Sequence, residues 1–256
     1  MPQPISSAGL PEYRNLPVIE IACGLRFYPL QIPVLQLGLL WETLREEYPT
    51  TAEMPLLAPV QKPSELLSAL PLPRLWFVSQ DDARIVQIQN DAFFVNWRKT
   101  SDSAPTPEFG KTRELFSSQL GQFEKFLSDR ELGRIVVSQY ELTYILHVPQ
   151  EKEQVGSVFP DFSWRDTAFE LGAFNWHTRF AHPATTGYLV AKISSAHLQE
   201  TGEDILRLEM GAVGPAEAAS NQPVGEWLDG ACRAIMLSIA HFVNEGVQKE
   251  RWGRLK

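Results

Sequence analysis

Runs of alternating or continuous hydrophobic residues predict most of the β-strands in this chain. Only Asn90 and Asp91 separate two of these runs, and two turn-forming residues at such a point predict a tight hairpin. Residues 50–73 contain five prolines and are expected to form a long loop with a short helix at 64–70. The expected strands cover residues 18–27, 74–80, 84–89, 92–98, 135–148, 167–174, 188–196 and 204–213.

Hydrophobic residues that recur every three or four positions predict three helices. The first covers residues 37–48. The second begins at Thr106 and ends near Gly133, and the third covers residues 224–248. Residues 149–165, which show neither periodicity, are expected to form a loop.

The expected elements follow one another as β-α-βββ-α and then as β-loop-βββ-α. This order predicts a structural duplication of residues 1–133 and 134–256 within one integrated domain. Two such halves can form one antiparallel sheet with the long helices packed on one face, which is an α+β architecture. The element order resembles TATA-binding-protein-like and helix-grip folds, and a likeness of fold implies no function by itself.

The expected hairpin has one face that is polar but contains neither Lys nor Glu. A two-residue turn places Gln87 opposite Phe94, and the alternation of side chains then separates this face from an apolar one. The strand expected at 135–148 repeats the pattern. The candidate residues for binding a ligand or a partner are therefore Gln87, Gln89, Asn96, Arg98, Gln139, Glu141 and His147.

These polar side chains have two interpretations. They could recognise a ligand through hydrogen bonds from amides, a carboxylate and a guanidinium. They could instead form a satisfied polar network, for example between Arg98 and Glu141, that fixes the register of the strands. The sequence leaves both open.

Composition narrows the class of protein. Of the 256 residues, 44% are hydrophobic and seven are Trp, which is enough to build a large core and excludes a disordered chain. The net charge of −8 disfavours a protein that coats nucleic acid. No apolar run is long enough to cross a membrane, so no membrane contact is predicted.

The start of the chain lacks a basic segment followed by an apolar one, so no secretory signal is expected and a cytoplasmic location is predicted. In that reducing compartment Cys23 and Cys232 are expected to be free thiols. One long-range disulfide between them is the alternative.

Motifs of common enzyme and cofactor families are missing from the sequence. It contains no P-loop and no G-x-G-x-x-G, G-x-S-x-G or H-E-x-x-H pattern. His177 and His182 lie five positions apart, which is weak spacing for a metal site. No catalytic residue, metal site or cofactor is predicted.

Several short pieces of the sequence carry a resemblance to one family. They include Gln-Ile-Gln at 87–89, Asn-Trp-Arg at 96–98 and Glu-Leu-Thr-Tyr at 141–144. The chain resembles a sporadically distributed family of bacterial and archaeal proteins of similar length that has no assigned function. Leu146 and His147 stand where that family is expected to have an Asn. The resemblance implies a full-length single-module protein, and the sporadic distribution favours a defence or toxin-related setting.

The first hypothesis for function is a non-enzymatic binding or regulatory protein that acts through a protein partner. The missing catalytic motifs and the long proline-rich loops favour it. A small-ligand sensor that uses the polar sheet face is one alternative. An enzyme of unrecognised type that uses Glu141, Arg98 and His147 is another. A homo-oligomer is compatible with all three hypotheses, and nucleic-acid binding is disfavoured.

Overall fold

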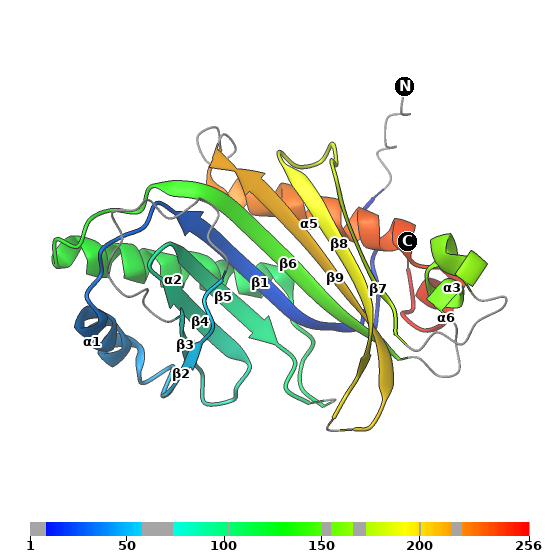
Figure 1. Cartoon of the computed structure of the whole chain (residues 1–256), viewed down its shortest axis with the longest axis horizontal. Coiled ribbons are helices and arrows are strands. Elements are labelled where there is room, and N and C mark those ends of the chain that lie inside the picture. Colours follow the sequence, from blue (N-terminus) through cyan, green and yellow to red (C-terminus); the bar gives the residue numbers. More distant parts are fainter. Residues whose placement is uncertain are drawn as a thin grey trace.

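The fold is known from a computed structural model, which describes residues 9–57, 74–101, 103–149, 155–165, 173–199, 201–216 and 222–255. Its centre is a nine-stranded antiparallel sheet that lies across two long helices (Figure 1). The expected α+β class with an antiparallel sheet is therefore confirmed. No helix in the described ranges has the length and hydrophobicity needed to cross a membrane.

The strands and helices have the following bounds. The strands are β1 (Val18–Phe27), β2 (Thr50–Met54), β3 (Arg74–Val78), β4 (Arg84–Gln89), β5 (Ala92–Arg98), β6 (Val137–Pro149), β7 (Asn175–Phe180), β8 (Tyr188–His197) and β9 (Asp204–Pro215). The helices are α1 (Val34–Leu44), α2 (Phe109–Asp129), α3 (Val155–Val158), the 3₁₀ helix η1 (Pro160–Arg165), α5 (Val224–Phe242) and α6 (Glu245–Glu250).

The middle of the sheet is formed by β1 and β6, which lie far apart in the sequence. The strand order is β2-β3-β4-β5-β1-β6-β9-β8-β7, so strands from both sides of Gly133 belong to one sheet. The predicted hairpin between β4 and β5 is confirmed, with Gln87 opposite Phe94 and Ile85 opposite Asn96. The polar side chains of these strands consequently share one face, as the alternation predicted.

The face of the sheet that meets α2 and α5 forms the core. Phe93 of β5 stacks on Phe123 of α2 with their ring centroids 5.2 Å apart. Tyr140 of β6 lies 5.6 Å from Trp227 of α5. Burying such rings contributes a large share of the hydrophobic stabilisation, because each removes a large apolar area from water. This face is shared by apolar residues of every central strand.

We call the opposite face of the sheet, which is turned away from α2 and α5, the outer face. Its residues alternate with the core residues along each strand. Those used below are Arg74, Trp76, Gln87, Gln89, Phe94, Asn96, Glu20, Gly24, Arg26, Gln139, Glu141, Thr143, His147, Arg207, Glu209, Gly211, Tyr188, Val190, Lys192 and Arg179.

A glycine on the outer face lets an aromatic ring lie directly on the sheet. Gly24 of β1 pairs with Phe94 of β5, and a Cβ at Gly24 would lie only 2.0 Å from Cδ1 of Phe94. The guanidinium of Arg26 lies over this ring, 5.5 Å from its centroid. Because Gly24 has no side chain, the ring of Phe94 can lie against the backbone of β1, where it contacts the buried guanidinium of Arg26.

Part of the stretch expected to be a loop at 50–73 is a strand. β2 pairs with β3 alone and lies at the edge of the sheet. An edge strand needs no continuous apolar run, so β2 gives little hydrophobic signal in the sequence. The prolines that follow it favoured the prediction of a loop. Residues 58–73, including the helix expected at 64–70, lie outside the described residues.

The other differences concern the second half and the helix ends. Within 149–165, expected as a loop, α3 and η1 are present. The second helix begins at Phe109 rather than Thr106. The last helix is not continuous, because the side chain of Asn244 accepts a hydrogen bond from the Gly246 amide at 2.7 Å and starts α6. Most of the strand expected at 167–174 lies outside the described residues, and β7 begins beyond it.

Both cysteines are free thiols, as predicted. Cys23 is buried beneath the helices, and this burial raises the pKa of its thiol. Burial also raises the pKa of Cys232 to about 11. Both groups are therefore protonated and unreactive at neutral pH.

Candidate functional site

Polar side chains of the first half form a continuous chain of hydrogen bonds on the outer face, which we call the relay. Oε1 of Gln87 accepts hydrogen bonds from Nε1 of Trp76 at 2.9 Å and from a guanidinium nitrogen of Arg74 at 3.3 Å. Nε2 of Gln87 then donates to Oδ1 of Asn96 at 2.5 Å. Nδ2 of Asn96 donates in turn to the carboxylate of Glu20. The relay therefore joins β3, β4, β5 and β1 through their side chains.

These predicted site residues are buried and already have partners. Gln87, Gln89 and Asn96 are only 6%, 4% and 5% exposed. Gln89 accepts a hydrogen bond from the amide of Leu57 at 3.0 Å and donates to the carboxylate of Asp91 at 2.6 Å. Buried amides with satisfied hydrogen bonds fix the register of strands and leave little capacity for a ligand. Their geometry favours the structural interpretation.

A second network lies on β1 and β6. Nε of Arg26 is 3.0 Å from a carboxylate oxygen of Glu141, which also accepts a hydrogen bond from Gln139 at 2.6 Å. The suggested pairing of Arg98 with Glu141 is wrong. Arg98 lies at the end of β5, where its Nε donates to the backbone oxygen of Asp82 at 2.6 Å. Arg26 takes the place beside Glu141 because the two residues lie on neighbouring central strands.

The residues considered for catalysis do not converge. Glu141 and His147 are six positions apart on β6, which at about 3.3 Å per residue separates them by about 20 Å. Arg98 contacts Asp82 instead of either of them. Within the described part of the chain, no group of three or more His, Cys, Asp and Glu residues is placed to hold a metal ion.

A group of accessible charged side chains lies on the second half of the outer face. Glu209 of β9 binds both Lys192 of β8, at 2.7 Å, and Arg207 of its own strand, at 2.8 Å. Burial opposes ionisation of Glu209, but the hydrogen bonds from the two cations hold the pKa of this carboxyl below its ordinary value. His147 of β6 lies opposite Arg207 in the strand register. All four side chains remain at least partly open to solvent.

Next to this group, Arg179 of β7 is stacked on an aromatic ring. Its guanidinium carbon lies 4.1 Å from the centroid of Tyr188, and the side chain is exposed. We call Arg179, Lys192, Arg207 and Glu209 the basic cluster. The sequence did not predict this cluster, because its residues belong to three strands that become neighbours only in the folded sheet. The alternation of Arg207 and Glu209 with buried residues in β9 was the available signal.

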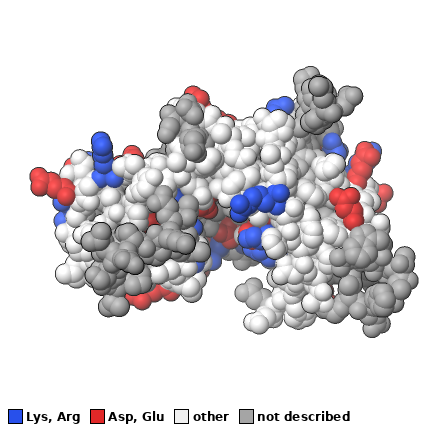
Figure 2. Space-filling model, turned by 45° about the horizontal axis from the view of Figure 1, so that its top comes forward, with Lys and Arg blue, Asp and Glu red and all other residues white. Residues whose placement is uncertain are grey.

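Charged side chains of both signs also gather on the surface of the molecule. Figure 2 shows Lys and Arg side chains gathered near the middle of the molecule, next to Asp and Glu side chains, where the surface is hollowed. The chain as a whole is acidic, with a net charge of −8. Cations grouped in this way mark a local reversal of the overall charge.

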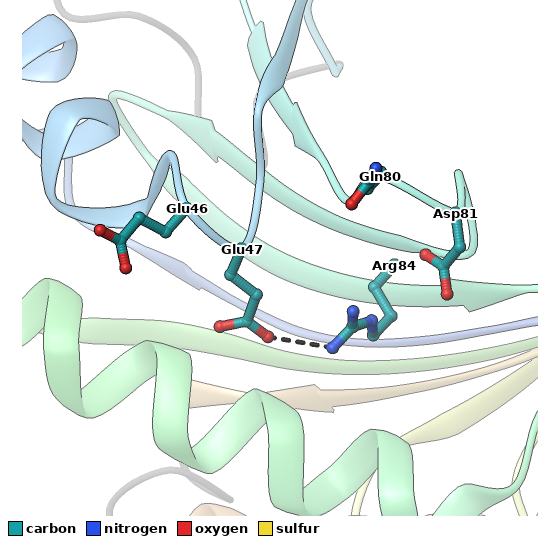
Figure 3. Close-up of a pocket in the computed structure, with 5 residues that line it drawn as sticks. All are labelled: Glu46, Glu47, Gln80, Asp81 and Arg84. Carbon is teal, nitrogen blue, oxygen red and sulfur yellow. Dashed lines mark hydrogen bonds and ion pairs between the residues drawn. The ribbon is translucent and has the colours of Figure 1, made fainter.

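A separate open depression of about 630 Å³ lies beside the turn that follows α1. Its lining residues are Glu46, Glu47, Gln80, Asp81 and Arg84, and Figure 3 shows Arg84 pointing toward Glu47. Their ion pair measures 3.0 Å. The depression contains none of the candidate residues from the sequence. Two of its carboxylates, Glu47 and Asp81, already have partners, so it adds no chemistry to the outer face.

The state of His147 gives a testable pH dependence. Burial, and then the charge of Arg207, lowers the pKa of His147. The unfolded chain therefore takes up a proton near pH 6.5 that the folded chain resists. The contribution of neutral His147 to the free energy of unfolding is therefore fully present above about pH 6.5. It is lost as the pH falls through the lower pKa that His147 has in the folded state. We expect acidification from pH 7.5 to 5.5 to cost less than about 1 kcal/mol through this group, after allowance for solvent screening.

Thermal unfolding at both pH values checks this expectation. The variant His147→Gln should show a smaller loss of Tm on acidification than the wild type. His177→Gln, at an exposed position on β7, is the matched control and should behave like the wild type. An unchanged pH dependence in His147→Gln would contradict the assignment, since the remaining slope would then belong to other groups such as His182, whose pKa is also lowered by burial.

Comparison with known proteins gives no relative. No protein-family model, curated protein or solved structure matches this chain. The family resemblance described from the sequence motifs therefore stays a prediction, and function has to be inferred from the site.

Proposed function

We propose that this chain is a non-enzymatic binding protein that holds a protein partner on the second half of its outer face. One observation carries the proposal. The amides Gln87, Gln89 and Asn96 of the first half are buried and already hydrogen-bonded, whereas on the second half Lys192 is exposed and His147, Arg207 and Glu209 are partly exposed. A rigid sheet that presents accessible side chains of this kind is suited to recognition.

We infer in addition that residues 1–133 and 134–256 are structural repeats. Three features support this inference. Each half begins with a central strand, β1 or β6, and pairs that strand with its own last strand, β5 or β9. Each half also continues into a long helix, α2 or α5, on the same face. This is the order expected of a TATA-binding-protein-like or helix-grip arrangement, in which the face opposite the helices is left for binding.

The small-ligand alternative has one observation in its favour. Nε of Arg74 is buried and makes no hydrogen bond with any described residue. Burial, and then repulsion from Arg26, lowers the pKa of this guanidinium. An anionic ligand group at this point would relieve both penalties. A defence or toxin-related setting for either function stays a prediction from the sequence.

Native mass spectrometry of the tagged protein, purified from its own host, tests the proposal. We expect a second polypeptide at fixed stoichiometry. Thr143→Arg places a long side chain on the accessible outer face and should remove that polypeptide. Ser117→Arg adds the same side chain to the exposed surface of α2 and should retain it.

Other outcomes separate the alternatives. A bare protein from every preparation would contradict the proposed function. A bare protein with a small, constant mass adduct would replace it with the small-ligand sensor. Loss of the second polypeptide from both variants would place the interface elsewhere, since Ser117 lies on a helix outside the outer face.

A further inference from the structure

The basic cluster has more positive than negative charge, although the chain is acidic. Arg179, Lys192 and Arg207 contribute three cations, and Glu209 contributes the one carboxylate that binds two of them. Arg179 forms no ion pair with any described residue. We propose that the basic cluster binds an acidic segment of a partner protein in an extended conformation, an inference that rests on the proposed function and names the chemistry of the partner.

The spacing of the cations fits an extended peptide. In the strand register, Arg179 lies opposite Val190, and Lys192 lies two residues further along β8. Lys192 in turn lies opposite Glu209, with Arg207 two residues further along β9. Such diagonal neighbours are about 7–8 Å apart. Side chains on one side of an extended peptide repeat at about 6.6 Å, so carboxylates at alternate positions can each meet one cation.

The basic cluster is also preorganised to bind a carboxylate. The stacking of Arg179 on Tyr188 at 4.1 Å restricts the guanidinium before any partner binds, which reduces the entropy lost on binding. Lys192 is half-exposed at its side chain and keeps donors beyond the one that binds Glu209. Toward β6, Ile145 lies opposite Glu209 and His147 opposite Arg207. Beside Val190 the outer face carries the small residues Gly211 and Thr143, which leave room for a peptide backbone.

The same features disfavour a nucleic-acid strand. A phosphate backbone carries negative charge at every unit and would meet Glu209 between the cations. Tyr188 is already covered by Arg179, so this ring is not free to stack with a base. A peptide can instead place a neutral residue beside Glu209 and carboxylates beside the cations.

Fluorescence anisotropy with a labelled decapeptide of alternating Glu and Ser tests the proposal on the full chain. The double variant Arg179→Ala/Lys192→Ala should weaken binding at least tenfold. Lys125→Ala/Lys249→Ala removes two cations from exposed pairs on α2 and α6, changes the net charge equally, and should stay within twofold of the wild type. Binding by the wild type should also weaken as salt rises.

Four results would overturn the proposal. Two concern the peptide itself: the wild type does not bind it, or both double variants weaken its binding equally. The other two concern competitors: oligothymidine binds more tightly than the peptide, or millimolar inorganic phosphate displaces the peptide fully, which would indicate a site for small anions. Failure here is distinguishable from failure of the proposed function. A second polypeptide that still copurifies with Arg179→Ala/Lys192→Ala and is lost from Thr143→Arg would retain the partner but exclude an acidic segment.

Discussion

Replacing Trp227 with alanine is expected to lower the free energy of unfolding by about 3–5 kcal/mol. Trp227 is completely buried, and its Nε1 donates a hydrogen bond to the backbone oxygen of Thr186 at 3.0 Å. Its ring packs against Tyr140 and fills the space above Gly214, where a Cβ would lie 2.5 Å from the ring. The substitution leaves a large cavity between α5 and the sheet, which the rigid strands cannot close.

Urea unfolding of the variant beside the wild type measures this loss. Trp97→Ala is the matched control, because Trp97 is only partly buried at the end of β5 and Lys111 lies 5.8 Å from its ring centroid. We expect the control to lose less than half as much stability. Equal losses would show that Trp227 does not anchor α5 to the sheet. Because folded domains are stable by about 5–15 kcal/mol, the predicted loss is a large fraction of the total.

Replacing Gln87 with leucine is expected to lower the free energy of unfolding by about 2–4 kcal/mol, because it breaks the relay at its centre. Gln87 accepts hydrogen bonds from Trp76 and Arg74 and donates one to Asn96. Leucine preserves much of the volume but leaves these buried groups without a partner. Unsatisfied buried donors and acceptors are costly because water cannot reach them.

Urea unfolding also tests this expectation, and Gln80→Leu, at an exposed position, is the control. The control should change the free energy of unfolding by no more than about 0.5 kcal/mol. If Gln87→Leu were as stable as the wild type, the relay would not serve to hold the strands. A stable Gln87→Leu variant that lost a copurifying small molecule would restore the ligand-binding interpretation of this residue.

The hairpin shows how much of the site could be predicted. Two turn-forming residues fix the register, and the register places Gln87 and Asn96 on one face. The pattern therefore predicted that these amides lie together. Whether they bind a ligand or one another depends on what covers them, and burial is set by the complete fold. The same limit applied to Glu141, whose partner Arg26 lies on a strand 115 positions away in the sequence.

The basic cluster shows what the pattern alone left hidden. Arg179, Lys192 and Arg207 belong to three different strands, and their diagonal arrangement exists only in the paired register. The local pattern of hydrophobic residues predicts where strands lie, but it does not specify which of them pair in the sheet. The edge strand β2 was missed for a related reason, since a polar strand with one neighbour needs no apolar run of its own.

The sequence by itself determined the class of fold, most of the strands and the two faces of the hairpin, because the alternation of side chains and the turn at Asn90 act over a few residues. The tertiary structure decided the strand order, with β1 beside β6, and thereby the partners of every charged group on the outer face. Side chains such as Arg26 and Arg98 have the same chemistry wherever they lie. Their roles differ because long-range pairing buries one against Glu141 and leaves the other at the end of a strand.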